Sequence, residues 1–193
     1  MADMRSSLLS LRPVCIAALT LTFTIGAAAA DSAFRLRSPT VAPNGTLSND
    51  QVYSGFGCSG KNISPELTWS GAPSGTKSFA VTVYDPDAPT GSGWWHWLVY
   101  NIPAGVTGLP VGAGSAGGKL PAGAVQSHTD FGTPGFGGAC PPAGDKPHRY
   151  IFTAYALKSE TIDAPDEASP AMVGFLILAN TLAKASLTAH YGR

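Results

Sequence analysis

The stretch SFAVTVY at residues 78–84 is rich in β-branched and aromatic side chains and runs directly into the turn-forming sequence DPDAP. Two more stretches of the same kind follow, HWLVY at residues 96–100 and YIFTAY at residues 150–155. Such residues favour strands, and the Gly, Pro and Asp residues that bound them favour turns. Shorter candidates are FRLR at residues 34–37 and LTW at residues 67–69. The sequence therefore predicts a mostly β domain.

The overall composition supports the same fold class. The 193 residues include 23 Gly and 16 Pro, a proportion of turn formers that argues against an all-helical bundle. No helix-length apolar pattern separates the strands, which disfavours the crossover connections that parallel sheets need. Residues 105–123, where Gly and Pro are dense, are expected to form a long surface loop. We therefore predict antiparallel strands joined by loops.

The last part of the chain shows a different period. Ser169 is a typical N-cap residue, and Pro170 suits the first turn of a helix. Apolar residues then recur at helical spacing, which predicts a helix of about five turns that ends near Gly192 and packs its apolar stripe on the sheet. The residues of this stripe are Met172, Phe175, Leu176, Ala179, Leu182, Ala183 and Leu187.

The first thirty residues have the pattern of a signal peptide. Arg5 and Arg12 supply positive charge, residues 14–25 are apolar, and residues 27–30 are four alanines. This order is typical of a secretory signal, so we predict cleavage after Ala30. The apolar run is shorter than the roughly 20 residues that span a bilayer, so a membrane anchor is the weaker alternative.

Export also bears on the cysteines. Residues 31–193, a single domain by size, contain only Cys58 and Cys140. An even pair of cysteines in an oxidising compartment favours a disulfide, with two separate thiols as the alternative. Lipidation of Cys15 is disfavoured, because the residues before it lack the pattern of a lipoprotein signal. We therefore predict a periplasmic or secreted protein.

The charge balance excludes one class of function. The chain has 12 Lys and Arg residues and 12 Asp and Glu residues, so its formal net charge is zero. Proteins that bind nucleic acids rely on clustered positive charge to hold the phosphate backbone. We therefore expect no nucleic-acid partner.

Polar and aromatic residues concentrate where the predicted strands meet loops. DPDAP at residues 85–89 follows the first strand, WWHW at residues 94–97 enters the second, and HRY at residues 148–150 enters the third. Loops that meet a rigid sheet are the usual location of functional sites. Taken singly, these aspartates are ordinary turn residues and these tryptophans ordinary core residues. Their combination indicates a site.

These motifs resemble those of the phosphatidylethanolamine-binding protein family, and most closely its bacterial Raf-kinase-inhibitor-like branch, often called YbhB/YbcL. Supporting stretches are NISP at residues 62–65, TDFG at residues 129–132 and GGACPP at residues 137–142, and the resemblance covers about residues 34–190. It implies an antiparallel β-sandwich with a C-terminal helix and a small anion-binding cavity at one end. It also implies that a disulfide would join the pocket-side loop to the loop around Asn62.

The resemblance further implies which residues form the cavity. The ligand-binding residues would be Asp85, Trp94, His96, His148 and Tyr150, and the rim residues would be Asp87, Pro89 and Pro142. Imidazole and phenol groups offer hydrogens to phosphate oxygens. A carboxylate that accepts from one ring nitrogen of a histidine fixes its tautomer, so that the other nitrogen faces the ligand. A second carboxylate and an indole face would attract an ammonium group, so we expect a phosphoethanolamine-type head group.

Two other classes of function stay open. The same Asp and His residues would serve an enzyme as acid, base or metal ligands. The chain lacks a Gly-x-Ser-x-Gly motif and the His or Cys spacing of common zinc sites, so we expect no catalysis, metal or cofactor. Alternatively, family members described as kinase or protease inhibitors suggest an interaction module, with an extracellular protease or host protein as partner.

Overall fold

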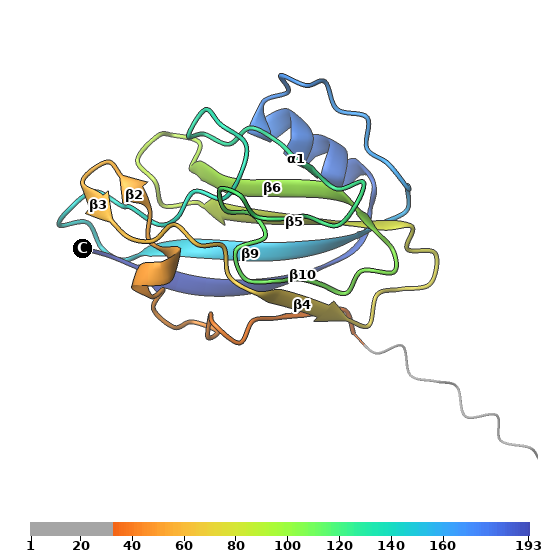
Figure 1. Ribbon diagram of the computed structural model, residues 1–193, viewed down its shortest axis with the longest axis horizontal. Helices are drawn as coiled ribbons and strands as arrows, with labels where there is room; N and C mark the ends of the chain where they lie inside the picture. Colours follow the sequence, from red (N-terminus) through yellow and green to blue (C-terminus); the bar gives the residue numbers. More distant parts are fainter. Residues whose placement is uncertain (1–32) are drawn as a thin grey trace, which may run out of the picture. The chain divides into compact units, whose positions relative to one another are not determined.

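The computed structural model describes residues 33–193, so the predicted signal peptide and its cleavage site lie outside the described residues. Within this range a five-stranded sheet has the order β10-β9-β5-β6-β8, a three-stranded sheet has the order β1-β4-β7, and β2 pairs with β3 (Figure 1). Neighbouring strands are antiparallel. The elements are β1 (Arg35–Arg37), η1 (Asn49–Gln51), β2 (Ser54–Gly55), β3 (Cys58–Ser59), β4 (Leu67–Ser70), β5 (Ser78–Asp85), β6 (Trp94–Pro103), β7 (Gly108–Leu109), β8 (Val125–Gln126), β9 (His148–Leu157), α1 (Pro170–Ala179) and β10 (Thr181–Tyr191).

Strand β5 lies at the centre of the larger sheet and is covered on both faces. Phe79 and Val81 belong to the core that the two sheets share, whereas Ala80 belongs to a second core that includes Val173 and Ile177 of α1. A strand covered on both faces has a nearly continuous apolar sequence, because both sets of alternating side chains are buried. The predicted mostly β, antiparallel fold is confirmed.

The core between the two sheets is closed by large side chains from both. Leu36 of β1, Trp69 of β4 and Leu109 of β7 come from the smaller sheet, and Phe79 and Phe152 come from the larger one. The ring centroids of Trp69 and Phe79 lie 5.3 Å apart across this interface. The two sheets therefore form a sandwich, with the apolar face of each one buried against the other.

The C-terminal helix is shorter than predicted. α1 begins at Pro170, and Ser169 caps it by accepting a hydrogen bond at 3.2 Å from the backbone N–H of Met172. The helix ends at Ala179 instead of near Gly192. It packs against β6, as Figure 1 shows. In the described part of the chain, no helix is long and apolar enough to cross a membrane.

The residues after the helix form β10, which pairs with β9 along its length. Every second residue of β10 contributes to the core between the sheets, namely Ala183, Ala185, Leu187 and Ala189. The helix prediction failed here because Ala and Leu favour helices, and because Ala183 and Leu187 fit a period of four as well as a period of two. Backbone pairing with β9 decides between the two, and that contact is distant in sequence.

The buried face of α1 also differs from the predicted stripe. Every residue of the helix is apolar, so its sequence pattern selects no particular face. Val173, Gly174 and Ile177 are buried, whereas Met172, Phe175 and Leu178 are exposed. Gly174 selects this face through close contact, because a Cβ atom there would lie 3.2 Å from the Trp95 ring.

The predicted loop at residues 105–123 contains only the two-residue strand β7, and turns make up most of the rest. Gly108 pairs there with Thr68 of β4, so the loop is attached to the smaller sheet. A Cβ atom on Gly108 would lie 2.6 Å from the carbonyl oxygen of Leu67, which explains why a glycine stands at this contact.

Replacing Phe152 with alanine is expected to lower the free energy of unfolding by about 3–5 kcal/mol, because its fully buried ring would leave a cavity in the sandwich. Phe175→Ala is the control, since that ring is 66% exposed and surface substitutions usually change stability by less than about 0.5 kcal/mol. Denaturant unfolding with the disulfide intact measures both. Equal losses would contradict this assignment of the core.

Candidate functional site

Three strand ends meet at one edge of the larger sheet. Because β5 runs antiparallel to both β6 and β9, the end of β5 lies beside the starts of its two neighbours, and Asp85 pairs directly with Trp94. A cavity of about 150 Å³ opens at this edge. All five predicted ligand-binding residues line it, namely Asp85, Trp94, His96, His148 and Tyr150.

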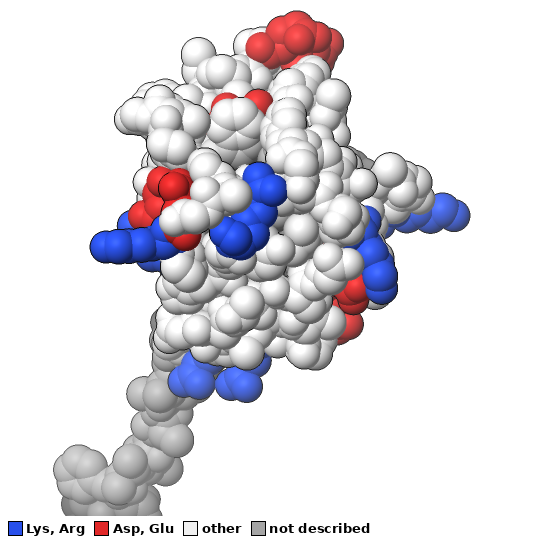
Figure 2. Space-filling model, turned by 90° about the vertical axis from the view of Figure 1, so that its left-hand side faces the viewer, with Lys and Arg blue, Asp and Glu red and all other residues white. Residues whose placement is uncertain are grey.

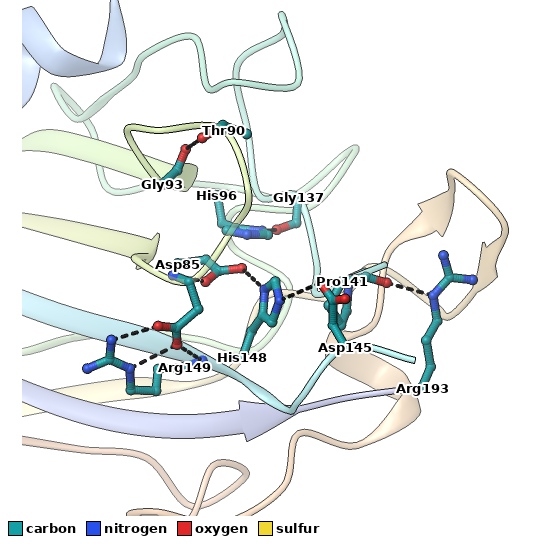
Figure 3. A network of polar contacts seen from close by, with 11 residues as sticks. Asp85, Thr90, Gly93, His96, Gly137, Pro141, Asp145, His148, Arg149 and Arg193 are labelled. Atoms are coloured by element: carbon teal, nitrogen blue, oxygen red, sulfur yellow. Dashed lines mark hydrogen bonds and ion pairs between the residues drawn. The ribbon is translucent and has the colours of Figure 1, made fainter. Parts of the chain in front are cut away.

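His148 is held by a buried carboxylate. Its Nδ1 lies 2.8 Å from Oδ2 of Asp85, and both side chains are buried. The other carboxylate oxygen, Oδ1, accepts a hydrogen bond at 2.8 Å from the backbone N–H of Asp87. A carboxylate only accepts, so Nδ1 of His148 carries the proton. Nε2 lies 3.4 Å from Oδ2 of Asp145, so the ring stands between two carboxylates (Figure 3).

His96 is held by the backbone. Its Nδ1 lies 2.7 Å from the carbonyl oxygen of Gly137, which fixes the proton on Nδ1 and leaves Nε2 as an acceptor in the neutral ring (Figure 3). Burial lowers the pKa of His96 below its ordinary value of 6.5, although the Gly137 carbonyl and the Asp85 charge oppose this shift. His96 is therefore neutral at neutral pH.

Two polar atoms of the lining lack partners. Nε1 of Trp94 and Oη of Tyr150 are buried and make no hydrogen bond to the described residues. Burial, and next the Asp85 charge, raise the pKa of Tyr150, so its phenol keeps the proton. The Cys140 backbone amide lies near enough to oppose this rise, but not in hydrogen-bonding geometry. A buried polar group without a partner costs about 1–3 kcal/mol, so a hydrogen bond to either atom would be stabilising.

Asp87, which was predicted at the rim, is not among the residues that line the cavity. Arg149 holds its carboxylate with three hydrogen bonds, from Nε at 2.8 Å, Nη2 at 2.7 Å and the backbone N–H at 2.9 Å. These bonds lower the pKa of Asp87 from 3.8 to about 2. The turn after β5 thus directs two carboxylates to different partners.

Pro89 and Pro142, the other predicted rim residues, do line the cavity.

Several important residues were missed by the sequence interpretation. Phe131 lines the cavity, and its ring centroid lies 5.4 Å from the rings of both Trp94 and His96. Phe56 lines it as well, and Asp145 approaches His148 from outside the lining. The TDFG stretch at residues 129–132 was a signal for Phe131. The positions of Phe56 and Asp145 depend on loop contacts that no local pattern shows.

The loops at the cavity are joined covalently and by the chain end. A disulfide joins Cys58 of β3 to Cys140, in the loop before β9. Arg193 bridges the same two segments, since its Nε donates to the carbonyl oxygen of Pro141 at 2.7 Å and its Nη1 to that of Gly57 at 3.0 Å. The Arg193 contact to Pro141 is visible in Figure 3. Both the disulfide and Arg193 therefore hold these two segments together at the cavity mouth.

The end of the molecule that carries β2, β3 and the C-terminus has few charged side chains. Figure 2 shows mostly uncharged surface there, with small separate groups of either sign. Charge at the cavity therefore comes from a small number of local groups. Two of these groups are Asp85 and Asp145, which lie at opposite ring nitrogens of His148. Among residues 33–193, no group of three His, Cys, Asp or Glu residues is placed to hold a metal ion.

Comparison with known proteins assigns the family. The family description "Phosphatidylethanolamine-binding protein" matches residues 37–192. The chain belongs to this family. The UPF0098 protein YbcL of Escherichia coli K12 is 58% identical over 172 residues, which cover 89% of this chain and 92% of YbcL. The UPF0098 protein YbhB of the same organism is 54% identical over 145 residues, 75% of this chain and 91% of YbhB.

A solved structure supports this assignment. The crystal structure of E. coli YbcL, described as a new member of the mammalian PEBP family, superposes with a TM-score of 0.82. The match covers 84% of this chain and 99% of that one, at 58% identity. The YbcL structure therefore shares the fold described above.

Replacing Arg149 with methionine is expected to raise the pKa of Asp87 from about 2 toward 3.8, because both guanidinium hydrogen bonds are lost. Since the folded-state pKa is depressed, this pair stabilises the fold fully above 3.8, and the stabilisation is lost as the pH falls through about 2. A carboxyl NMR titration measures the shift. Lys61→Met, which removes the exposed pair with Asp50, is the control, and an Asp87 pKa that both variants leave unchanged would refute the assignment.

Proposed function

We propose that the protein binds a small phosphate-containing or zwitterionic head group, of the phosphoethanolamine type, in the cavity at the ends of β5, β6 and β9. The main support is the pair of buried donors without partners, Trp94 Nε1 and Tyr150 Oη, in a cavity that His96 and His148 also line. A tetrahedral oxyanion offers several acceptor oxygens to such donors.

The size of the cavity supports a head group over a whole lipid. Its volume is about 150 Å³. Pockets for drug-sized ligands usually measure about 300–1,000 Å³, so this one accommodates only a small group. Pro89 and Pro142 in the lining keep the backbone of the mouth rigid, because the proline ring fixes φ.

The surrounding carboxylates suit a ligand that also carries an ammonium group. Asp85 is already engaged by His148 and a backbone amide, and Asp87 is engaged by Arg149. Asp145 is 43% exposed and contacts only Nε2 of His148 among these groups. When Nε2 of His148 also carries a proton, an anion that accepts from it would displace Asp145, whose carboxylate then pairs with the ammonium group of the same ligand. The Trp94 ring, which lines the cavity, offers a cation–π face to such a group.

We further propose that the protein works in the periplasm or outside the cell, as a binding protein without a catalytic step, cofactor or metal ion. The signal-peptide pattern of residues 1–30 supports export. The Cys58–Cys140 disulfide fits the same location, since disulfides persist in oxidising compartments.

Tyr150→Phe tests the proposal because it removes only the phenol oxygen. We expect calorimetry to show an affinity for phosphoethanolamine reduced by about tenfold or more, the value of one hydrogen bond to a charged group. The free energy of unfolding should stay equal or rise, because the substitution removes a buried hydroxyl without a partner.

Tyr155→Phe is the matched control for this experiment. Tyr155 lies on the same strand, is similarly buried and belongs to the core beneath α1. Its loss of a hydroxyl should leave the affinity unchanged. If the Tyr150→Phe variant binds phosphoethanolamine as tightly as the unaltered protein does, the proposed site is contradicted.

Anion affinity is expected to rise as the pH falls from about 8 to 5, through the imidazole range. Burial lowers the pKa of His96, and a bound anion favours the charged ring, so binding takes up a proton. Sulfate is the best probe, because its charge stays constant over this range while that of a phosphate monoester changes. A flat sulfate affinity would contradict this linkage.

A further inference from the structure

A second cavity, of about 370 Å³, adjoins the first. Of the described residues, Phe131 is the one that lines both cavities. The second cavity is otherwise formed by the glycine-rich segments 114–118 and 133–137 and by polar side chains from other loops. No Asp, Glu, Lys, Arg or His residue lines it. Its chemistry therefore differs from that of the head-group cavity.

Internal hydrogen bonds make the walls of this cavity rigid. The Asn62 amide donates to the carbonyl oxygen of Phe136 at 3.1 Å and accepts from the N–H of Gly138 at 2.6 Å. Ser115 Oγ donates to the carbonyl oxygen of Asn62 at 3.2 Å, and Thr129 Oγ1 donates to a carbonyl oxygen of its own loop at 3.0 Å. These polar groups form hydrogen bonds within the protein, so the shape of the cavity is set before any ligand binds.

Three other polar groups of the lining are free to bind. Oε1 of Gln126 accepts from Nε1 of Trp97 at 2.6 Å, which assigns the amide orientation and leaves Nε2 with two N–H groups. The other two groups are the hydroxyls of Thr133 and Tyr53. None of the three groups makes a hydrogen bond to another residue within 33–193. All three groups are polar side chains, and together they supply both donors and acceptors.

Aromatic rings complete the cavity. Tyr53 and Phe131 are stacked, with ring centroids 4.4 Å apart, and both line it. Gly137 leaves room for Phe131, because a Cβ atom on residue 137 would clash with the ring. The cavity thus combines an apolar ring surface with hydroxyl and amide groups.

We propose that this second cavity binds an uncharged, hydroxyl-rich group, such as a sugar or another polyol. Such a group packs its C–H atoms on aromatic rings, and its hydroxyls both donate to and accept from Gln126, Thr133 and Tyr53. A charged ligand would lose its hydration without gaining an opposite charge, and an apolar ligand would leave the three groups without partners. The volume lies within the range of about 300–1,000 Å³ for small-molecule sites.

The polyol has two possible sources. It is either a free sugar or the polyol part of a phosphate ester whose phosphate occupies the neighbouring cavity across Phe131. The first source is independent of the head-group function proposed above, and the second extends it.

The test is an NMR titration of the isotope-labelled protein with glucose, ribose and glycerol, then with glucose 6-phosphate and glycerol 3-phosphate. We expect saturable shifts of the backbone amides in segments 114–118 and 133–137 with at least one probe. If a phosphate ester spans both cavities, it binds more tightly than its unphosphorylated counterpart, and Tyr150→Phe removes that gain.

Gln126→Glu is the decisive variant, because it keeps an acceptor for the Trp97 indole and replaces the amide N–H groups with a carboxylate. It should weaken binding by about tenfold or more. Thr133→Val, at an exposed position, gives a second measurement should the first variant be unstable. Tyr155→Phe controls for general effects on the fold.

Two results would overturn the proposal. In the first, none of the five probes shifts the amides of the two segments. In the second, both variants bind as tightly as the unaltered protein. A separate titration with phosphoethanolamine reports on the head-group cavity, so failure of one site is distinguished from failure of the other.

Discussion

Antiparallel pairing of β5 with both β6 and β9 is the constraint on which the site depends. It places the end of one strand and the beginnings of two others at a single edge of the sheet. Residues as distant in sequence as Asp85 and His148 therefore come within hydrogen-bonding distance. The strands themselves are held by burial on both faces, between the smaller sheet and α1. Site geometry and core packing thus rest on the same backbone pairing.

The turn after β5 also separates the charges. Asp85 and Asp87 stand two residues apart, yet one is buried against an imidazole and the other is paired with a guanidinium on the outside. Each carboxylate thus interacts with a donor group of its own. That donor offsets part of the repulsion between the carboxylate and an anion in the cavity. The two cavities on either side of Phe131 extend this separation, since the first contains the ionisable groups and the second contains none of the charged residue types or histidine.

The sequence was sufficient for the parts of the fold that have strong local patterns. Strands β5, β6 and β9 were predicted because their residues are β-branched or aromatic and are bounded by turn formers. Strand β10 was mistaken for helix because alternation of Ala and Leu is ambiguous until its partner strand is known. The candidate ligand-binding residues came from a family resemblance, and spacing alone would not have shown that their segments converge. The outward direction of Asp87 depends on Arg149, which no local pattern indicates.

The position of β10 has a consequence for how the chain reaches its final structure. The last strand covers the core with Leu187 and Ala189, and the last residue, Arg193, ties two loops at the cavity mouth. Contacts of this kind join the carboxyl terminus to segments more than a hundred residues earlier, as with Gly57. Contacts between segments so far apart in the sequence carry a large entropic cost of loop closure and form slowly. We therefore expect the Arg193 contacts at the cavity mouth to form late in folding.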